Sequence, residues 1–202
     1  MATILLKLFA TGNVSHILNE RQAMHSYLQR VQQAIDDAVC GMSNQQLAWH
    51  REGKWSAAAI LEHLSLTYSG TAKNLERCLA AGRPGITRPT ARQRVRGFVV
   101  TRLRYMPQGR EAPSTVVPKG APPESVLADV RRTLSAADNA ISRCEAQFGA
   151  GARIANHPIL GPLTARQWRT FHLVHARHHM KQIAHIRAEI AAEEKAMAAR
   201  RG

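Results

Sequence analysis

The stretch LTARQWRTFHLVHARHHMKQIAHI, residues 163–186, predicts one long amphipathic helix with a sharply marked start. Thr164 and Gln167 have the spacing of a capping box, in which each side chain binds the backbone N–H of the other residue. Leu163 and Trp168 are placed to make the hydrophobic contact that often accompanies such a box. This stretch therefore indicates a helix that begins after Thr164.

Three more segments carry apolar residues every three or four positions, as on the buried face of a helix. Ser56 can cap the second of them, and Gly149 can end the third. The three segments cover residues 16–40, 57–81 and 123–148. Four such helices bury their apolar faces most simply as a four-helix bundle with neighbours near antiparallel, so the predicted fold class is all-α.

The connection between the second and third helices, residues 83–122, is far longer than a bundle turn requires. Its content of Pro, Gly and Arg predicts a basic crossover over one end or side of the bundle, with a short helix around residues 90–105. A chain of 202 residues with 45% apolar composition suits one core. We therefore expect a single domain over residues 1–202, with residues 1–14 as a tail.

The net charge of +14 would attract nucleic acid, anionic lipid or acidic small molecules. Eight arginines and no acidic residue lie between Arg83 and Arg110. A solvated basic loop is the simplest interpretation of this segment, because only Phe98 and Tyr105 could stack on bases there. Arg92, Arg94 and Arg96 could instead draw an anionic substrate toward a cleft. The scarcity of aromatic residues argues against nucleic-acid binding.

The three cysteines are far apart and form no C-x-x-C pair, so neither a disulfide framework nor a thiolate zinc site is indicated. This usage favours a reducing, cytoplasmic setting. The opening MATILLKLFATGN does not have the pattern of a signal peptide, and no apolar run approaches the length that spans a membrane.

The histidines of the fourth helix are unequal in direction. At about 100° per residue, His175 and His179 lie within roughly 20° of the direction shared by Trp168 and Ile186, in the middle of the apolar stripe. Two imidazoles at this spacing can reach one metal ion, but they can also be core histidines with ordinary hydrogen bonds. The others turn toward the flanks: His172, His178 and His185.

A third metal ligand would have to come from another helix, and His63 is the natural candidate on the second. Its direction is shared by small and polar residues, which would suit the wall of a cleft. A partly exposed histidine at the shoulder of the helix is an equal alternative on spacing alone.

Two motifs of the chain resemble the DinB-like (YfiT-like) superfamily of metal-binding four-helix bundles. KWSAAAILEHL is similar to its second-helix signature, and NHPILGPLTARQWRTFHLVHARHHMKQ is similar to its fourth-helix signature. The resemblance implies that His63, His175 and His179 hold a divalent metal ion, such as zinc, nickel or iron, with one position open. Gln182, one turn beyond His179, could bond a ligand or a bound water.

The implied chemistry is activation of a water molecule or of a low-molecular-weight thiol, hence a hydrolase or a thiol S-transferase that acts on a small molecule. The catalytic residues are unknown, because no carboxylate offers a convincing general base. Glu62 is expected on the solvent side, and Asp129 and Asp138 off the apolar stripe. The alternative is a non-catalytic basic bundle that binds nucleic acid or a protein, and a homodimer is possible in either case.

Overall fold

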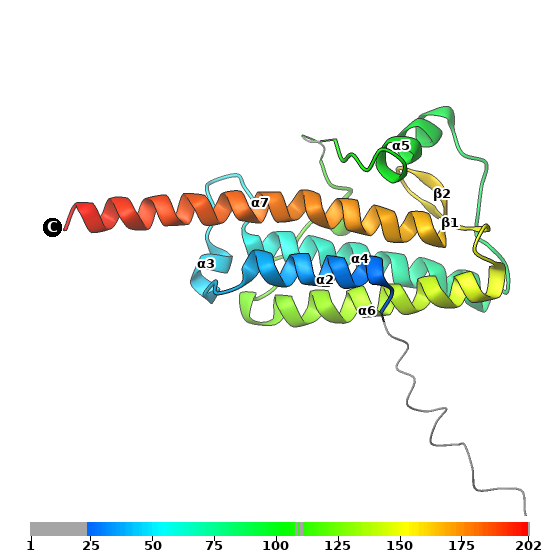
Figure 1. Cartoon of the computed structure of the whole chain (residues 1–202), viewed down its shortest axis with the longest axis horizontal. Helices are drawn as coiled ribbons and strands as arrows, with labels where there is room; N and C mark the ends of the chain where they lie inside the picture. Colours follow the sequence, from blue (N-terminus) through cyan, green and yellow to red (C-terminus); the bar gives the residue numbers. More distant parts are fainter. Residues whose placement is uncertain (1–23, 108, 110, 202) are drawn as a thin grey trace, which may run out of the picture.

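The computed structural model describes residues 24–107, 109 and 111–201, and its four long helices form a bundle (Figure 1). The elements in chain order are α2 (Ser26–Val39), α3 (Asn44–Ala48), α4 (Ala57–Ala80), α5 (Ala91–Thr101), the 3-10 turn η1 (Ser114–Val116), α6 (Pro123–Phe148), β1 (Arg153–His157), β2 (Gly161–Thr164) and α7 (Ala165–Ala199). The predicted all-α bundle is confirmed. The expected tail at 1–14 and the first turns of the expected first helix lie outside the described residues, and the single domain stays a prediction.

The helix ends lie where the sequence places them. Ser56 caps α4 by accepting a hydrogen bond from the backbone N–H of Ala59. At α7, Thr164 and Gln167 form the full capping box. Gly149 follows α6 with a φ of 93°, a conformation that suits glycine because it lacks a Cβ atom. These local signals fix the position of the histidine-rich helix in the chain.

The closest helix pairs run parallel, which corrects the expectation of antiparallel neighbours. Between α4 and α6, the Thr133 hydroxyl donates to Ser65 and the Cys144 thiol lies against the carbonyl of Leu75. Residue numbers increase in the same direction along both helices, so the two helices are parallel. The pair α2 and α7 is also parallel (Figure 1). Parallel neighbours cannot be joined by a tight turn, and this is why a crossover must separate α4 from α6.

The crossover contains the predicted short helix, and α5 packs beside the β-hairpin over the amino-terminal half of α7 (Figure 1). Two glycines allow this close packing. A Cβ atom on Gly97 would lie 3.1 Å from the carbonyl oxygen of Leu160. Gly161, with a φ of 76°, leaves room for Pro89 and Gln93. The amide of Gln93 also donates to the carbonyl of Pro158, so α5 is fixed to the hairpin.

The β-hairpin, the short helix α3 and the 3-10 turn η1 were not predicted. The antiparallel hairpin pairs Ala155 with Leu163 and His157 with Gly161, just before α7. The short helix α3 lies against the far part of α7, where Trp49 donates to Glu193. Beyond Ile190, the described residues of α7 are exposed, and the helix extends past the bundle (Figure 1). Among the described helices, none is both long and apolar enough to cross a membrane.

Candidate metal centre

Three histidines from two helices meet inside the bundle. His63 lies on α4, and His175 and His179 lie one turn apart on α7. The Nε2 atom of His175 is 3.2 Å from Nε2 of His63 and 3.0 Å from Nε2 of His179. One donor nitrogen from each ring lies within 4.8 Å of the other two. The structure therefore brings together the three residues selected from the sequence.

Two of the rings are held from behind. The Nδ1 atom of His63 is 2.8 Å from the carbonyl oxygen of Val116, and that of His179 is 2.7 Å from Oε1 of Gln182. A carbonyl oxygen only accepts, so each Nδ1 must carry the proton and donate. In a neutral ring, the Nε2 atom then presents a lone pair, and both lone pairs face His175.

Aromatic side chains hold the rings in place from the sides. The indole of Trp55 packs on His63, with ring centroids 5.2 Å apart. Phe171 stacks on His175 at 5.3 Å with an angle of 13° between the planes. His63 and His179 are buried, and His175 is partly buried. The cluster therefore sits close to the surface of the bundle, beneath the crossover.

Burial lowers the pKa of all three imidazoles, because the charged form is poorly solvated there. For His179 the pKa falls to about 3, from burial first and from His63 second. His175 is further disfavoured as a cation by His179 and His63. All three rings are thus neutral at physiological pH, the form that binds a metal ion.

Glu62 is not on the solvent side, as its helix position suggested. It is 9% exposed, and its carboxylate accepts hydrogen bonds from the backbone N–H groups of Lys119, Gly120 and Ala121 at 2.8–2.9 Å. The same crossover segment supplies the Val116 carbonyl that orients His63. Adjacent residues of α4 therefore tie the crossover to the cluster.

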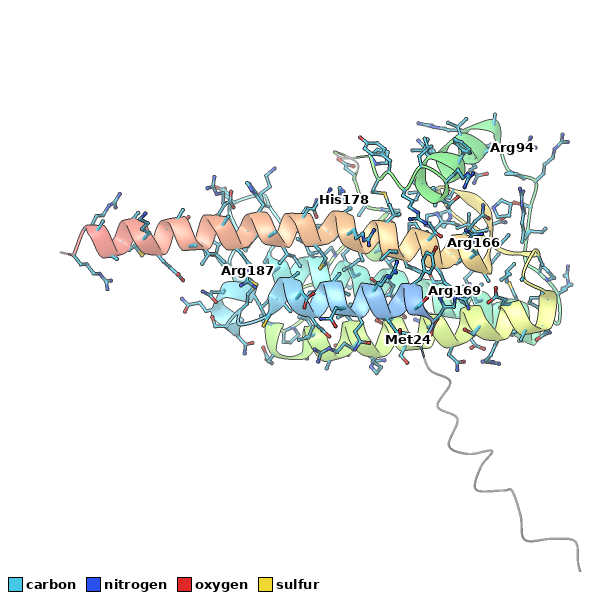
Figure 2. All side chains as sticks on the ribbon, in the orientation of Figure 1. Met24, Arg94, Arg166, Arg169, His178 and Arg187 are labelled. Carbon is cyan, nitrogen blue, oxygen red and sulfur yellow. The ribbon has the colours of Figure 1, made fainter. Side chains whose placement is uncertain are left out.

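Gln182 also differs from its expected inward position. Gln182 is exposed, yet its side-chain oxygen accepts a hydrogen bond from His179 and so covers one edge of the cluster. His178 is partly buried beside it and packs on the His179 ring at 5.2 Å. Figure 2 shows His178 on the side of α7 that faces away from α2. Gln182 and His178 therefore both contact the ring of His179.

Three other polar residues on α6 and α7 show what spacing alone could not reveal. His172 is fully buried between Tyr68 and Trp168 rather than at a shoulder, and neither of its nitrogens has a hydrogen-bond partner among the described residues. His185 is exposed, with its Nε2 atom 3.3 Å from Glu189. Asp138, expected off the stripe, is buried and accepts from the backbone N–H of His25. None of these groups joins the three-histidine cluster.

The residues present fit a divalent ion. Imidazole nitrogens bind zinc at about 2.0–2.1 Å, and two of them around a tetrahedral ion lie roughly 3.3–3.4 Å apart. The two Nε2 separations of 3.0 and 3.2 Å are close to that spacing. The Nε2 atoms of His63 and His179 both present lone pairs to His175, whose Nε2 can donate a proton to only one of them, whereas a cation between the rings can bind all three. The donor set suits zinc, nickel, cobalt or iron alike.

Comparison with known proteins is consistent with this geometry. Residues 28–186 match the profile of a family described as "Protein of unknown function (DUF1569)". The chain belongs to the DUF1569 family. A sequence comparison with curated proteins gives no match. The DUF1569 assignment thus covers all of α4 and the histidine-rich part of α7 without indicating an activity.

A solved structure places this DUF1569 protein in a wider fold group. The chain is similar to YfiT from Bacillus subtilis, described as a probable metal-dependent hydrolase with an unusual four-helix bundle topology. The TM-score is 0.51 at 17% sequence identity, over 85% of this chain and 92% of YfiT. The resemblance to the DinB-like (YfiT-like) fold, indicated by two sequence motifs, is confirmed.

Proposed function

We propose that His63, His175 and His179 bind one divalent metal ion and that the protein is a metal-dependent enzyme acting on a small molecule. The observation that supports this most directly is the convergence of three neutral imidazoles on one point between α4 and α7. A purely structural role would not require their nitrogens to face each other.

The chain's own groups hold the ligands in one tautomer and one orientation. Val116 accepts from His63, and Gln182 accepts from His179, so each ring keeps its Nε2 lone pair toward the common centre. Such outer hydrogen bonds raise the basicity of a metal-binding imidazole and restrict its rotation. Trp55 and Phe171 restrict the rings further.

Three neutral ligands leave the charge of a divalent ion uncompensated, which lowers the pKa of a water or thiol that binds it. Among the described residues, the neighbouring carboxylate of Glu62 is already committed to three backbone N–H groups. The protein's own contribution is therefore to bind and orient rather than to supply a carboxylate base.

Hydrolysis is our first proposal for the reaction, since YfiT is described as a probable metal-dependent hydrolase. Our second proposal is transfer of a low-molecular-weight thiol to an electrophile. A thiol loses its proton more readily than water does, so this reaction does not require a carboxylate base. The expected homodimer, the cytoplasmic location and the identity of the ion stay predictions.

The two reactions can be separated with one set of proteins. The protein is stripped with a chelator, reloaded with Zn²⁺, Ni²⁺ or Fe²⁺, and assayed against small amides and esters, and against thiols with an electrophilic fluorophore. We expect turnover that requires the ion, is lost in His179→Ala and persists in His178→Ala. Activity that survives both the chelator and His179→Ala would contradict the proposal.

A further inference from the structure

A cavity lies away from the three histidines, between α5, the hairpin and the first turns of α7. Its volume is about 620 Å³, within the range of sites that hold small molecules. Five arginines line it: Arg94, Arg102, Arg104, Arg153 and Arg166. We call it the arginine cavity.

The lining carries five positive charges and, among the described residues, no aspartate or glutamate. The ion pairs of the described chain involve other arginines. Five like charges around one hollow repel each other, so they raise the free energy of the protein unless an anion lies among them.

Specific contacts hold α5 in place as one wall of the cavity. Gly97 permits contact with the Leu160 carbonyl, and Gln93 bonds the Pro158 carbonyl, so α5 cannot easily move away from the hairpin. Arg104, just after α5, has a φ of 54°. It is the non-glycine residue with a positive φ in the described part of the chain, a conformation that costs about 1 kcal/mol or more and often marks a functional site.

The cavity is distinct from the candidate metal centre. Arg166 and Thr170 supply its α7 wall. At about 100° per residue, Thr170 lies roughly 140° around the helix from His175 and roughly 180° from His179. The cavity therefore opens on the outer face of α7, under α5, whereas the histidines face α4. Figure 2 shows Arg94 on α5 and Arg166 on α7 at this end of the bundle.

We infer that the arginine cavity binds a small phosphate ester with several negative charges, of about nucleotide size. Guanidinium groups match phosphate oxygens in pairs, and each phosphate brings one to two charges at neutral pH with several acceptor oxygens. Gln167 and Thr170 add polar groups, and the first turn of α7 adds the positive end of a long helix. Five cations suit a polyphosphate better than a single carboxylate.

The lining also offers apolar contact for the organic part of such a ligand. Phe98 is 57% exposed although it is an aromatic residue, and Tyr27 of α2 also lines the cavity. A flat ring can stack on an exposed phenyl group. The proposed ligand therefore places its phosphates among the arginines and its organic group toward Phe98.

The test uses the full-length protein with sodium tripolyphosphate as the probe, followed by titration calorimetry. The protein is first treated with a chelator, so that an ion at the three histidines cannot bind the probe. We expect saturable binding at one site, weakened about tenfold or more in Arg94→Gln/Arg166→Gln, because two charge-assisted contacts are lost. Phe98→Ala should weaken adenosine triphosphate but leave tripolyphosphate unchanged.

Arg88→Gln/Arg92→Gln is the matched control, since it removes the same amount of charge from two exposed positions of the crossover that lie outside the cavity lining. This variant should bind within about twofold of the original protein, apart from weak long-range attraction. No saturable binding, or equal losses in the two double variants, would overturn the proposal. Tighter binding of citrate than of tripolyphosphate would overturn the assignment to phosphate.

The four substituted arginines are exposed, so both variants should keep the thermal unfolding temperature of the original protein. Because binding is measured without metal, its failure would leave the proposed metal chemistry untouched. A failure of metal binding would equally leave this proposal standing.

Discussion

The Nδ1 atom of His63 donates to the carbonyl oxygen of Val116 across 2.8 Å, which joins a candidate metal ligand to the crossover. The preceding residue, Glu62, binds three backbone N–H groups of the same segment. The crossover is thus held at two neighbouring points of α4. Its position should therefore affect both the stability of the fold and the orientation of His63.

Replacing Glu62 by Gln should loosen this attachment. A glutamine accepts through one oxygen only, and its NH₂ group would face backbone N–H donors. Because hydrogen bonds to a charged acceptor contribute about 1.5–3 kcal/mol, we expect the free energy of unfolding to fall by about 2–4 kcal/mol. Metal affinity should fall about tenfold, as when an outer hydrogen-bond partner is lost. Denaturant unfolding and competition with a chelator measure the two effects.

Glu76→Gln is the matched control for this prediction. Glu76 lies on the same helix and pairs with Arg143 at the surface, where both side chains are about half exposed. An exposed ion pair contributes about 0–1 kcal/mol, so this variant should be nearly unchanged. Equal effects of the two substitutions would show that Glu62 does not hold the crossover.

Acid should destabilise the fold through His157. Burial lowers the pKa of His157 to about 4, and its Nδ1 atom accepts from the backbone N–H groups of Ile159 and Leu160. Protonation would remove that acceptor. Between pH 6.5 and 4 the unfolded chain binds the proton and the folded chain does not, so stability falls as the pH falls. The slope is about 1.4 kcal/mol per pH unit for this group.

His157→Asn should reduce that slope, because asparagine keeps an acceptor oxygen that does not titrate in this range. Denaturant unfolding at a series of pH values measures it. His185→Asn, at an exposed position, should leave the slope unchanged. If His157→Asn showed the full acid dependence, another group would be responsible.

The ion pair between Arg169 and Glu145 should be more sensitive to loss of the carboxylate than to loss of the guanidinium. The Arg169 side chain is 5% exposed, bonds Glu145 at 2.5 Å and also donates to Ser142. Glu145→Ala leaves a buried charge with one weak partner, at a cost of about 3 kcal/mol. Arg169→Met removes the charge and keeps the volume, so it should cost less.

Thermal or denaturant unfolding of the two variants decides this prediction. Asp129→Ala, which removes the exposed partner of Arg132, serves as the reference for a surface pair. Glu145→Ala should be clearly less stable than this reference. Similar unfolding free energies for all three variants would contradict the prediction, because they would mean that water solvates the Arg169 guanidinium.

The sequence predicted the bundle because its signals are local. Ser56, Thr164 and Gln167 cap helices through residues three positions away, and the apolar spacing is set by the helical repeat. The parallel pairing of α4 with α6 was missed, since spacing shows which face is buried but not which neighbour covers it. The hairpin was missed for a related reason: its pairs, such as Ala155 with Leu163, depend on a turn and packing under α5.

The three histidines could be selected because α7 places His175 and His179 on adjacent turns by geometry alone, and because the second-helix motif contains His63. The partners behind them could not. Val116 is 53 residues from His63 in the chain, and the contact of Glu62 with Lys119 spans 57 residues. Such contacts depend on the position of the crossover, and no periodicity in the sequence predicts that position.

The most direct test is the metal content of protein purified without a histidine tag, measured by elemental analysis with His175→Ala and His178→Ala alongside. Removing one of three converging ligands should abolish stoichiometric binding, whereas removing the neighbouring imidazole should not. We predict one divalent ion per chain in the original protein and in His178→Ala, and almost none in His175→Ala. Equal metal content in all three proteins, or none after reloading with Zn²⁺, Ni²⁺ and Fe²⁺, would contradict the proposed centre.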